Sequence, residues 1–311
     1  MLSVKHLIDT YSLTADDITQ ILDTAASFES VNNRAIKKVP ALRGRTIVNL
    51  FLEPSTRTKS SFELAEKRLS ADSLSMGGST SSVVKGESLA DTIQTISAMN
   101  VDMFVCRAKL AGTPQRITEN TDAVVINAGD GKHQHPTQAM LDLYTIRKNF
   151  GHLDGLKVAI VGDLAHSRVC GSLAPALKTM GAEVTLVGPP TFQVDDPDWF
   201  GCPQTASLDD VIEDMDVVYM LRVQLERMEG AAIPSRREYN RLYGLDMTRV
   251  NRMKPGAIIC HPGPMNRGME INDDVAYCAR SRILNQVNAG VLTRMAEMYL
   301  LLGGENNGLS A

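Results

Sequence analysis

The chain has 311 residues, of which 43% are hydrophobic and 22% are charged. At roughly 150 residues per domain, this length predicts two domains with cores of their own and excludes a peptide, a disulfide-stapled mini-fold and a fibre. The 32 basic and 36 acidic residues give a net charge of −4 and form no long Lys/Arg run, so we expect neither a nucleic-acid partner nor a membrane partner.

The cellular compartment is predicted from features that the sequence lacks. No apolar run approaches the roughly 18 residues of a membrane span, and the N-terminus has no apolar segment typical of a signal peptide, so we expect a cytoplasmic protein. The five cysteines form no C-x-x-C motif, which argues against a disulfide framework and against a zinc site. We expect reduced core thiols at Cys106, Cys170, Cys202, Cys260 and Cys278.

Short β-branched runs alternate with helical patterns along most of the chain. The predicted strands span residues 46–52, 101–106, 124–126, 158–161, 184–187, 217–220 and 257–260. Two apolar stripes at helical spacing lie between the first two strands: Phe62, Ala65 and Leu69, then Leu89, Ile93 and Ile96. Strands that alternate with helices are typical of βαβ units, so the predicted class is α/β, with parallel sheets flanked by helices.

A domain boundary is predicted near residue 150, where one helix ends at Gly151 and a new strand follows. We expect a first domain over residues 1–150 and a second over residues 151–287. A C-terminal helix at about 288–302 is expected to pack back on the first domain. The Pro-rich stretch 188–206 is predicted to be a surface loop.

The densest group of anion-binding side chains is Ser55-Thr56-Arg57-Thr58, which follows a strand and precedes the helix that carries Phe62. A helix N-terminus offers unpaired N–H groups and the positive end of the helix dipole, and this motif adds three hydroxyls and a guanidinium. An ordinary N-cap needs only one hydroxyl and does not explain the arginine. The motif therefore predicts a phosphate site.

A second candidate site is a Gly-rich turn at residues 127–134 that leads into His135-Pro136-Thr137-Gln138. Pro136 suits the first turn of a helix, and His135 and Gln138 share a helix face. His133 and His135 have no carboxylate or cysteine at a familiar metal-ligand spacing, so we expect no metal. Taken alone, a histidine in this position is more often structural than catalytic.

Three predicted strand ends in the second half also carry polar residues. Gly162-Asp163 lacks the G-x-G-x-x-G fingerprint, so we expect no nicotinamide site there, and the nearby Arg168 offers a fork suited to a carboxylate. The other two ends carry Arg222 with Gln224 and the turn at residues 261–264. Because the carboxyl ends of parallel strands line ligand crevices, five such ends in two domains indicate a binding site for an anionic ligand.

At these residues the chain resembles the aspartate carbamoyltransferases over almost its whole length. The matching motifs shared with ornithine carbamoyltransferases are Ser55-Thr56-Arg57-Thr58, Arg107, the segment that begins Lys85-Gly-Glu-Ser, and His135-Pro-Thr-Gln138. Those that resemble the aspartate enzymes are Arg222-Val-Gln224-x-Glu-Arg227 and His261-Pro-Gly-Pro264. The S-M-G and H-C-L-P segments typical of ornithine enzymes do not occur in the second half. The resemblance implies two α/β domains with the active site in the cleft between them.

The resemblance also implies the reaction: carbamoyl transfer from carbamoyl phosphate to the amine of L-aspartate, in pyrimidine biosynthesis, without metal or organic cofactor. The implied phosphate ligands are Ser55, Thr56, Arg57, Thr58 and Arg107. The carbamoyl group is expected to contact Thr58, Arg107, His135, Gln138 and the backbone at Pro262, Gly263 and Pro264. Of these, Arg57, Thr58, Arg107 and His135 are the implied catalytic residues. The implied aspartate ligands are Lys85, Arg168, Arg222 and Gln224.

Family members are trimers in which a loop reaches into the neighbouring active site, so the resemblance places Ser81 and Lys85 of one chain in the site of the next and predicts a homotrimer. It leaves open a regulatory subunit or a dihydroorotase as partner. Two other functions stay open on the residues themselves. One is carbamoyl transfer to ornithine or another amino acid. The other is a non-catalytic sensor of an anionic metabolite, which would need the pocket but not the oxyanion donors Arg107 and His135.

Overall fold

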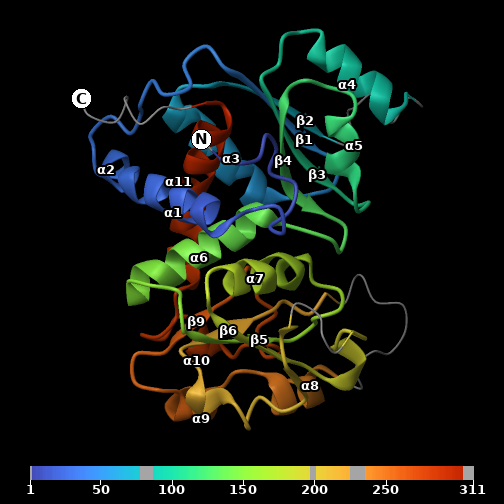
Figure 1. Cartoon of the computed structure of the whole chain (residues 1–311). Coiled ribbons are helices and arrows are strands. Elements are labelled where there is room, and N and C mark those ends of the chain that lie inside the picture. Colours follow the sequence, from blue (N-terminus) through green and yellow to red (C-terminus); the bar gives the residue numbers. More distant parts are fainter. Residues whose placement is uncertain (1, 78–86, 197–200, 225–234, 304–311) are drawn as a thin grey trace. The chain divides into compact units, whose positions relative to one another are not determined.

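The computed structural model describes residues 2–77, 87–196, 201–224 and 235–303. The chain divides into two compact units, the first made of residues before 145 together with those from 288 onward, the second of residues 145–287. Each unit contains a parallel sheet flanked by helices (Figure 1), which confirms the predicted α/β class.

The first unit is built on a four-stranded sheet in the order β2-β1-β3-β4. Its strands are β1 (Thr46–Phe51), β2 (Asp72–Gly77), β3 (Met103–Ala108) and β4 (Val124–Asp130). The helices that belong to it wholly or in part are α1 (Ala15–Ser27), α2 (Glu29–Asn32), α3 (Thr56–Leu69), α4 (Leu89–Ser97), α5 (Thr113–Thr118), α6 (Pro136–Phe150) and α11 (Ile283–Leu301). Because the chain passes from β1 to β2 in one direction and back past β1 to β3 in the other, right-handed crossovers place α3 on one face and α4 and α5 on the opposite face (Figure 1).

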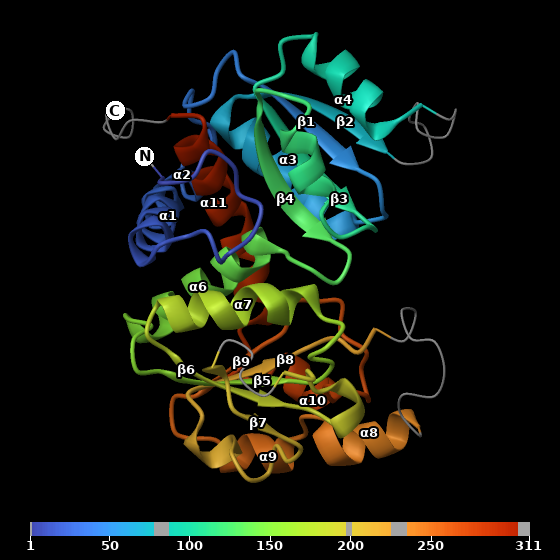
Figure 2. The same cartoon turned by 45° about the vertical axis from the view of Figure 1, so that its right-hand side comes forward.

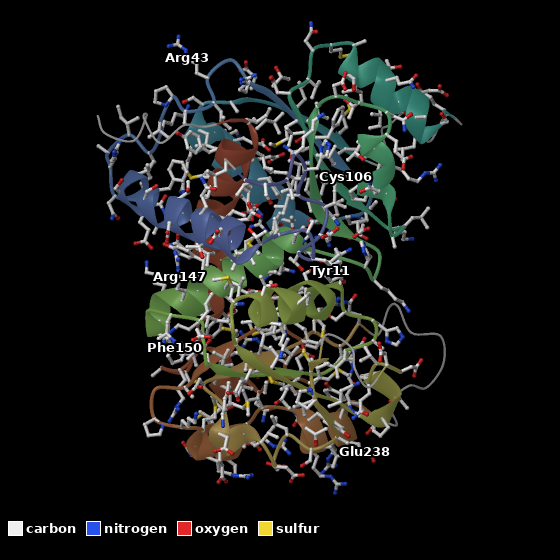
Figure 3. The ribbon with its side chains drawn as sticks, in the orientation of Figure 1. Tyr11, Arg43, Cys106, Arg147, Phe150 and Glu238 are labelled. Carbon is white, nitrogen blue, oxygen red and sulfur yellow. The ribbon has the colours of Figure 1, made fainter. Side chains whose placement is uncertain are left out.

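The core of the first unit follows the alternation of its strands. One face of the sheet packs against α4 and α5 through Val48, Leu50, Phe104, Ile93 and Ile117. Cys106 belongs to the same buried cluster, and Figure 3 shows it on β3 among the side chains of that unit. On the opposite face, the Asn49 amide donates to both carboxylate oxygens of Glu66 on α3 at 2.9 Å.

The second unit is built on a five-stranded parallel sheet in the order β7-β6-β5-β8-β9. Its strands are β5 (Lys157–Val161), β6 (Glu183–Val187), β7 (Gln204–Thr205), β8 (Val217–Met220) and β9 (Ile258–Cys260). Its helices include α7 (Arg168–Thr179), α8 (Arg236–Tyr243), α9 (Met247–Arg252) and α10 (Asp273–Ala276). Figure 2 shows α7 on one face of the sheet and α8 and α9 on the other.

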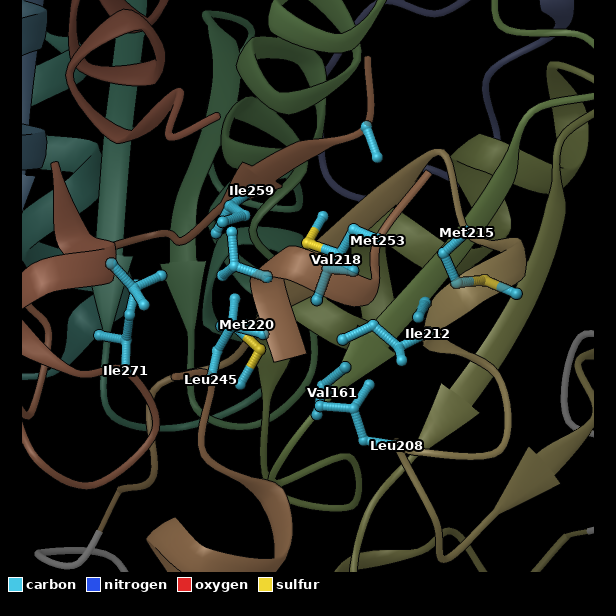
Figure 4. Packing of buried hydrophobic residues seen from close by; sticks show 14 of the residues in the cluster. Val161, Leu208, Ile212, Met215, Val218, Met220, Leu245, Met253, Ile259 and Ile271 are labelled. Carbon is cyan, nitrogen blue, oxygen red and sulfur yellow. The ribbon is translucent and has the colours of Figure 1, made fainter. Parts of the chain in front are cut away.

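The main core of the second unit lies between the sheet and the helices on the α9 face (Figure 4). Val161, Val218 and Met220 point from alternate strand positions into a buried cluster with Ile212 and Met253. Nearly continuous burial along β5, β8 and β9 is typical of a parallel sheet that is covered on both faces.

All seven strands expected from the sequence are present, and their ends differ from the expected ones by at most four residues. Two further strands in the described residues were not predicted: β2 is an edge strand whose residues are all exposed or half-buried, and β7 has only two residues. The prediction of a surface loop over 188–206 was wrong in part, because Phe192 and Cys202 are buried there and β7 pairs with β6. The C-terminal helix begins at Ile283, about five residues earlier than the predicted start near residue 288.

Of the helices in the described part of the chain, none has both the length and the apolar character needed to cross a membrane. All five cysteines are free, and four of them are buried, while Cys278 is only partly so. Burial raises the pKa of the Cys106 and Cys170 thiols, so neither is a thiolate nucleophile near neutral pH.

Candidate active site

In the first unit, the strand order itself selects the location of the site. The chain leaves β1 toward β2 on one side and later returns to β3 on the other side of β1. The connections that leave the carboxyl ends of β1 and β3 therefore run in opposite directions. Ligands of parallel sheets bind in the crevice that such a divergence leaves. Residues 53–58 follow β1, and Arg107 stands near the end of β3, opposite Phe51 in the register.

The segment after β1 ends at the N-terminus of α3, as the sequence predicts. Ser55 is the N-cap residue with extended backbone, yet its hydroxyl makes no capping hydrogen bond. Thr56 and Arg57 occupy the first turn and are exposed, whereas Thr58 is buried, and no acidic residue lies in that turn. A 14-residue helix with open N–H groups, a cation and no carboxylate in its first turn is suited to hold an anion.

Arg107 links the ends of β1 and β3 through its guanidinium. Its Nε lies 2.7 Å from Glu53 Oε1, and its NH1 group donates to Thr58 Oγ1 at 3.1 Å. Both side chains of the ion pair are largely withdrawn from solvent, at 14% and 10% exposure. Glu53 was not among the predicted site residues, because charge complementarity gives no reason to expect a carboxylate beside a site for an anion. The signal available in the sequence was its position two residues before Ser55.

The third strand end of the first unit is organised around the buried carboxylate of Asp130 on β4. One oxygen accepts from the Gly112 amide at 2.7 Å and lies 3.1 Å from His133 Nδ1. The other accepts from Asn127 Nδ2 and from the Gln134 amide. Four interactions on one carboxylate hold the turn between β4 and α6 in a single conformation, which makes His133 a partner of Asp130.

Gly131 in this turn has φ +48°, and a Cβ there would lie 2.9 Å from the backbone nitrogen of Ala111. The glycine is thus needed for both its dihedral angle and the close approach of the loop after β3. His135 follows this turn and is 4% exposed. Its Nδ1 lies 3.4 Å from Thr137 Oγ1. The α6 helix then begins at Pro136, as predicted, and Gln138 is also buried.

The second unit repeats this arrangement with β5 and β8. After β5 the chain proceeds to β6 and β7 on one side and returns to β8 on the other. Gly162 follows β5 with φ +132°, and a Cβ there would lie 3.2 Å from Leu221 and from Tyr239. Arg168 is the first residue of α7, and its side chain is buried. The Ser167 hydroxyl caps that helix by accepting from the Cys170 amide at 3.3 Å.

Arg222 and Gln224 follow β8, and the turn after β9 lies beside them. Arg222 is half-buried and Gln224 is buried. Asn266 Nδ2 donates to the Val223 carbonyl at 2.9 Å, which ties the two segments together. The strand ends after β5, β8 and β9 are neighbours in the sheet, so Arg168, Arg222 and the 261–264 turn share one edge.

His261 fixes the conformation of the turn after β9. Its Nδ1 accepts from the Gly263 amide at 2.8 Å, so the proton is on Nε2, which lies 3.2 Å from the buried Glu270. The His261 amide donates to Gln286 Oε1 at 2.9 Å, and Glu270 also accepts from the Asn266 amide. Gly263 has φ +63°, a conformation that glycine adopts without strain. His261 is thus a structural residue of the turn, a role that its sequence position did not reveal.

Two predicted residues, Ser81 and Lys85, lie outside the described part of the chain, as does Arg227 of the second motif. In residues 2–77, 87–196, 201–224 and 235–303 no group of three or more His, Cys, Asp or Glu side chains is arranged to hold a metal ion. The remaining predicted residues fall into two sets that follow or end strands of one sheet each: the first unit carries Ser55, Thr56, Arg57, Thr58, Arg107, His135 and Gln138, and the second carries Arg168, Arg222, Gln224, Pro262, Gly263 and Pro264.

Comparison with known proteins supplies a family for this pair of sites. Residues 5–148 match the model of the aspartate/ornithine carbamoyltransferase carbamoyl-P binding domain, and residues 154–301 match that of the Asp/Orn binding domain. An aspartate carbamoyltransferase catalytic subunit from Thermobifida fusca is 54% identical over 301 residues, which cover 97% of this chain and 96% of the relative.

Two solved structures are also similar. The catalytic subunit of aspartate transcarbamoylase from M. jannaschii is 36% identical with a TM-score of 0.85, and the match covers 98% of this chain and 100% of that one. Aspartate transcarbamoylase from Trypanosoma cruzi, in complex with N-(phosphonacetyl)-L-aspartic acid, is 29% identical with a TM-score of 0.87 and 96% coverage of both chains.

Proposed function

This chain belongs to the aspartate/ornithine carbamoyltransferase family and transfers the carbamoyl group of carbamoyl phosphate to L-aspartate in pyrimidine synthesis. We propose that each of its two sets of site residues binds one of the two substrates. The first unit binds carbamoyl phosphate and the second binds aspartate. In functional terms the domains are residues 1–150, with the helix at 288–302, and residues 151–287. The matched ranges of the two family models support the boundary near residue 150, and the grouping of residues from 288 onward with the first unit supports the assignment of the C-terminal helix.

The phosphate group binds at the N-terminus of α3. Its ligands are Ser55, Thr56, Arg57, Thr58 and Arg107. The open first turn of α3 and the uncommitted Ser55 hydroxyl support this assignment, because both supply donors without a competing acceptor. The ion pair with Glu53 keeps the Arg107 guanidinium beside Thr58, so that neither donor has to be ordered when the substrate arrives.

The carbamoyl group is held by donors on its oxygen and acceptors on its nitrogen. Thr58, Arg107 and His135 donate to the oxygen, while Gln138 and the backbone at Pro262, Gly263 and Pro264 bind the NH2 group. A proline residue has a backbone carbonyl but no N–H, so its backbone can only accept a hydrogen bond, which suits it to the carbamoyl NH2 group. The hydrogen bonds of His261 support a rigid turn at these positions.

Aspartate brings two carboxylates, and the second unit offers two arginines and an amide to receive them. Its ligands are Arg168, Arg222 and Gln224, with Lys85 of a neighbouring chain. Guanidinium groups bind carboxylates through two parallel hydrogen bonds. The ammonium group of ornithine would be repelled by Arg222, which favours aspartate over that acceptor.

The reaction needs no protein nucleophile. The aspartate amine forms a bond to the carbamoyl carbon and an oxyanion develops on the carbamoyl oxygen. The carbon–oxygen bond to phosphate then breaks, and the departing phosphate takes up the proton that the amine loses. Orientation of two bound reactants can supply up to ~7–11 kcal/mol, and donors fixed on the developing oxyanion supply more. Arg57, Thr58, Arg107 and His135 are the catalytic residues because they contact the oxygens that gain negative charge.

Assembly and location are also part of the proposal. Ser81 and Lys85 act in the site of a neighbouring chain, so the active form is a homotrimer in which each chain gives one loop and receives another. We place this enzyme in the cytoplasm, where a regulatory subunit or a dihydroorotase is a candidate partner.

The observation that carries the proposal is the convergence of the Ser55 motif, Arg107 and the His135 turn at three neighbouring strand ends of one sheet. The test is an assay of purified protein with carbamoyl phosphate and either aspartate or ornithine, scoring phosphate release and the carbamoylated product. We expect N-carbamoyl-L-aspartate. Equal or better kcat/KM with ornithine would overturn the acceptor, and phosphate-site binding without turnover would support the sensor.

A further inference from the structure

Gln138 has a partner that the proposed reaction leaves unexplained. Asp142 lies four residues further along α6, on the same helix face, and its Oδ1 accepts from Gln138 Nε2 at 3.0 Å. Both residues are buried, with Gln138 at 8% and Asp142 at 0% exposure. Asp142 is therefore buried and hydrogen-bonded to a residue that we assign to the carbamoyl group.

The chemistry of this contact fixes the orientation of the Gln138 amide. An ionised carboxylate can only accept hydrogen bonds, whereas an amide has a donor end and an acceptor end. Asp142 therefore takes the amide NH2, and the amide oxygen is left as the end that is available to a ligand. Within the described residues that oxygen receives no hydrogen bond. A fixed acceptor at this point suits the NH2 group of carbamoyl phosphate.

A buried cation supports the carboxylate of Asp142. Arg294 on α11 donates from NH1 to Ser61 Oγ at 2.7 Å and to the Gly290 carbonyl at 3.0 Å, and its guanidinium lies 5.0 Å from the centre of the Phe62 ring. Burial lowers the pKa of Arg294 to about 10, against the opposing effect of the negative charges of Glu297 and Asp142, so Arg294 stays charged at neutral pH. A cation close to a buried carboxylate offsets part of its desolvation cost.

We propose that Asp142 is a positioning residue that holds the Gln138 amide with its oxygen toward the carbamoyl NH2 and thereby makes the site selective for carbamoyl phosphate over acyl phosphates that lack this group. This inference rests on the proposed role of Gln138. Acetyl phosphate is the natural probe, because a methyl group replaces the NH2 and cannot donate a hydrogen bond. Inorganic phosphate probes the anion site alone.

The first test is Asp142→Asn, which keeps the size of the side chain but adds a donor. The introduced amide can donate to the Gln138 oxygen and turn the glutamine so that its NH2 faces the NH2 of the substrate. We expect the affinity for carbamoyl phosphate to fall about tenfold, as for one lost hydrogen bond, while acetyl phosphate and phosphate bind as in the wild type. Asp17→Asn is the matched control, since it perturbs the capping box of α1 in the same unit. Equal weakening of all three ligands by Asp142→Asn would overturn the proposal.

A second pair of variants keeps Asp142 and so does not depend on how Asp142→Asn folds. A protonated glutamate at position 138 can donate its O–H to Asp142 and present its carbonyl oxygen to the substrate. Gln138→Glu should therefore regain selectivity for carbamoyl over acetyl phosphate as the pH falls, whereas Gln138→Ala should not. Titrations of Arg294, Glu297 and the ligands are common to both variants and cancel in the comparison. Identical pH profiles would overturn the role of Asp142.

These outcomes are distinct from a failure of the proposed function. Wild-type turnover of aspartate and a loss of selectivity in Gln138→Ala test the function itself. If both hold, the Asp142→Asn effect should also vanish when it is combined with Gln138→Ala, because the positioned group is then gone. An Asp142→Asn effect that persists in the Gln138→Ala background would contradict the inference and leave the function intact.

Discussion

Arg107 Nε and Glu53 Oε1 lie 2.7 Å apart at the ends of two neighbouring parallel strands, so a carboxylate stands beside the site that we propose for phosphate. Glu53 would repel a phosphate bound there, but it holds the guanidinium beside Thr58. The carboxylate of Glu53 is therefore expected to weaken phosphate binding and to favour catalysis.

Glu53→Gln should separate those two effects. Removal of the negative charge is expected to leave phosphate binding unchanged or tighter, while loss of the charge-assisted hydrogen bond lets Arg107 move and lowers kcat by roughly tenfold or more. Steady-state kinetics and phosphate titration of the variant measure both quantities. A weaker phosphate affinity with unchanged kcat would contradict the positioning role.

Arg57→Ala should reduce kcat by roughly the 10²–10³ typical of one lost transition-state donor. The matched control is Lys59→Ala on the same helix. Lys59 Nζ lies 3.8 Å from Glu63 Oε1, and Lys59 is not part of the proposed site. Rates at saturating substrates test this prediction. Equal losses in the two variants would mean that general positive charge on α3, rather than Arg57 itself, matters.

Arg222→Ala should act mainly through the acceptor, raising the KM for aspartate and relaxing the choice of amino acid. Arg252→Ala is the control in the same unit, since Arg252 forms an exposed ion-pair cluster with Asp209 and Glu213. Competition between aspartate and other amino acids at fixed carbamoyl phosphate gives the readout. Aspartate kinetics unchanged by Arg222→Ala would remove Arg222 from the site.

The trimer proposal predicts complementation between inactive chains. Arg57→Ala and Lys85→Ala proteins should each be nearly inactive alone. After dissociation, mixing and reassembly, a site that takes Arg57 from one chain and Lys85 from the next is intact, and activity should return. Demonstrably mixed trimers without activity would show that Lys85 does not act in a neighbouring site.

Glu297 on α11 gives a pH-dependent prediction for stability. Burial raises the pKa of Glu297 to about 8, against the opposing effect of Arg294, and in the described part of the chain neither carboxylate oxygen has a hydrogen-bond partner. The folded state keeps this proton above pH 4.5, where the unfolded chain releases it. The contribution to stability is therefore complete below about pH 4.5 and is lost as the pH rises to about 8, by about 1.4 kcal/mol per pH unit at most.

Glu297→Gln cannot ionise and should remove that slope. Urea unfolding of both proteins between about pH 5 and pH 8 is the measurement, and the variant should gain stability relative to the wild type as the pH rises. Parallel pH profiles would show that Glu297 is already ionised in the folded protein.

Local patterns in the sequence were enough for the α/β class, for seven strands, and for the placement of the Ser55 motif at a helix start and Pro136 in a first helical turn. Each of these depends on hydrophobic periodicity, turn chemistry or backbone preferences within a few residues. The resemblance to carbamoyltransferases likewise rested on short contiguous motifs, and the family matches over residues 5–148 and 154–301 confirm it.

Contacts between segments distant in the chain were decided by the tertiary structure. The order β2-β1-β3-β4 makes Glu53 a neighbour of Arg107, and the packing of α11 on α3 brings Arg294 to Ser61 across more than two hundred residues. The edge strand β2 was missed because it contains no β-branched or aromatic residue, so its local propensity for a strand is low, and its pairing with β1 stabilises it instead. Asp142 drew no prediction for a similar reason: its burial and its hydrogen bond to Gln138 depend on how α6 packs, which no local pattern reports.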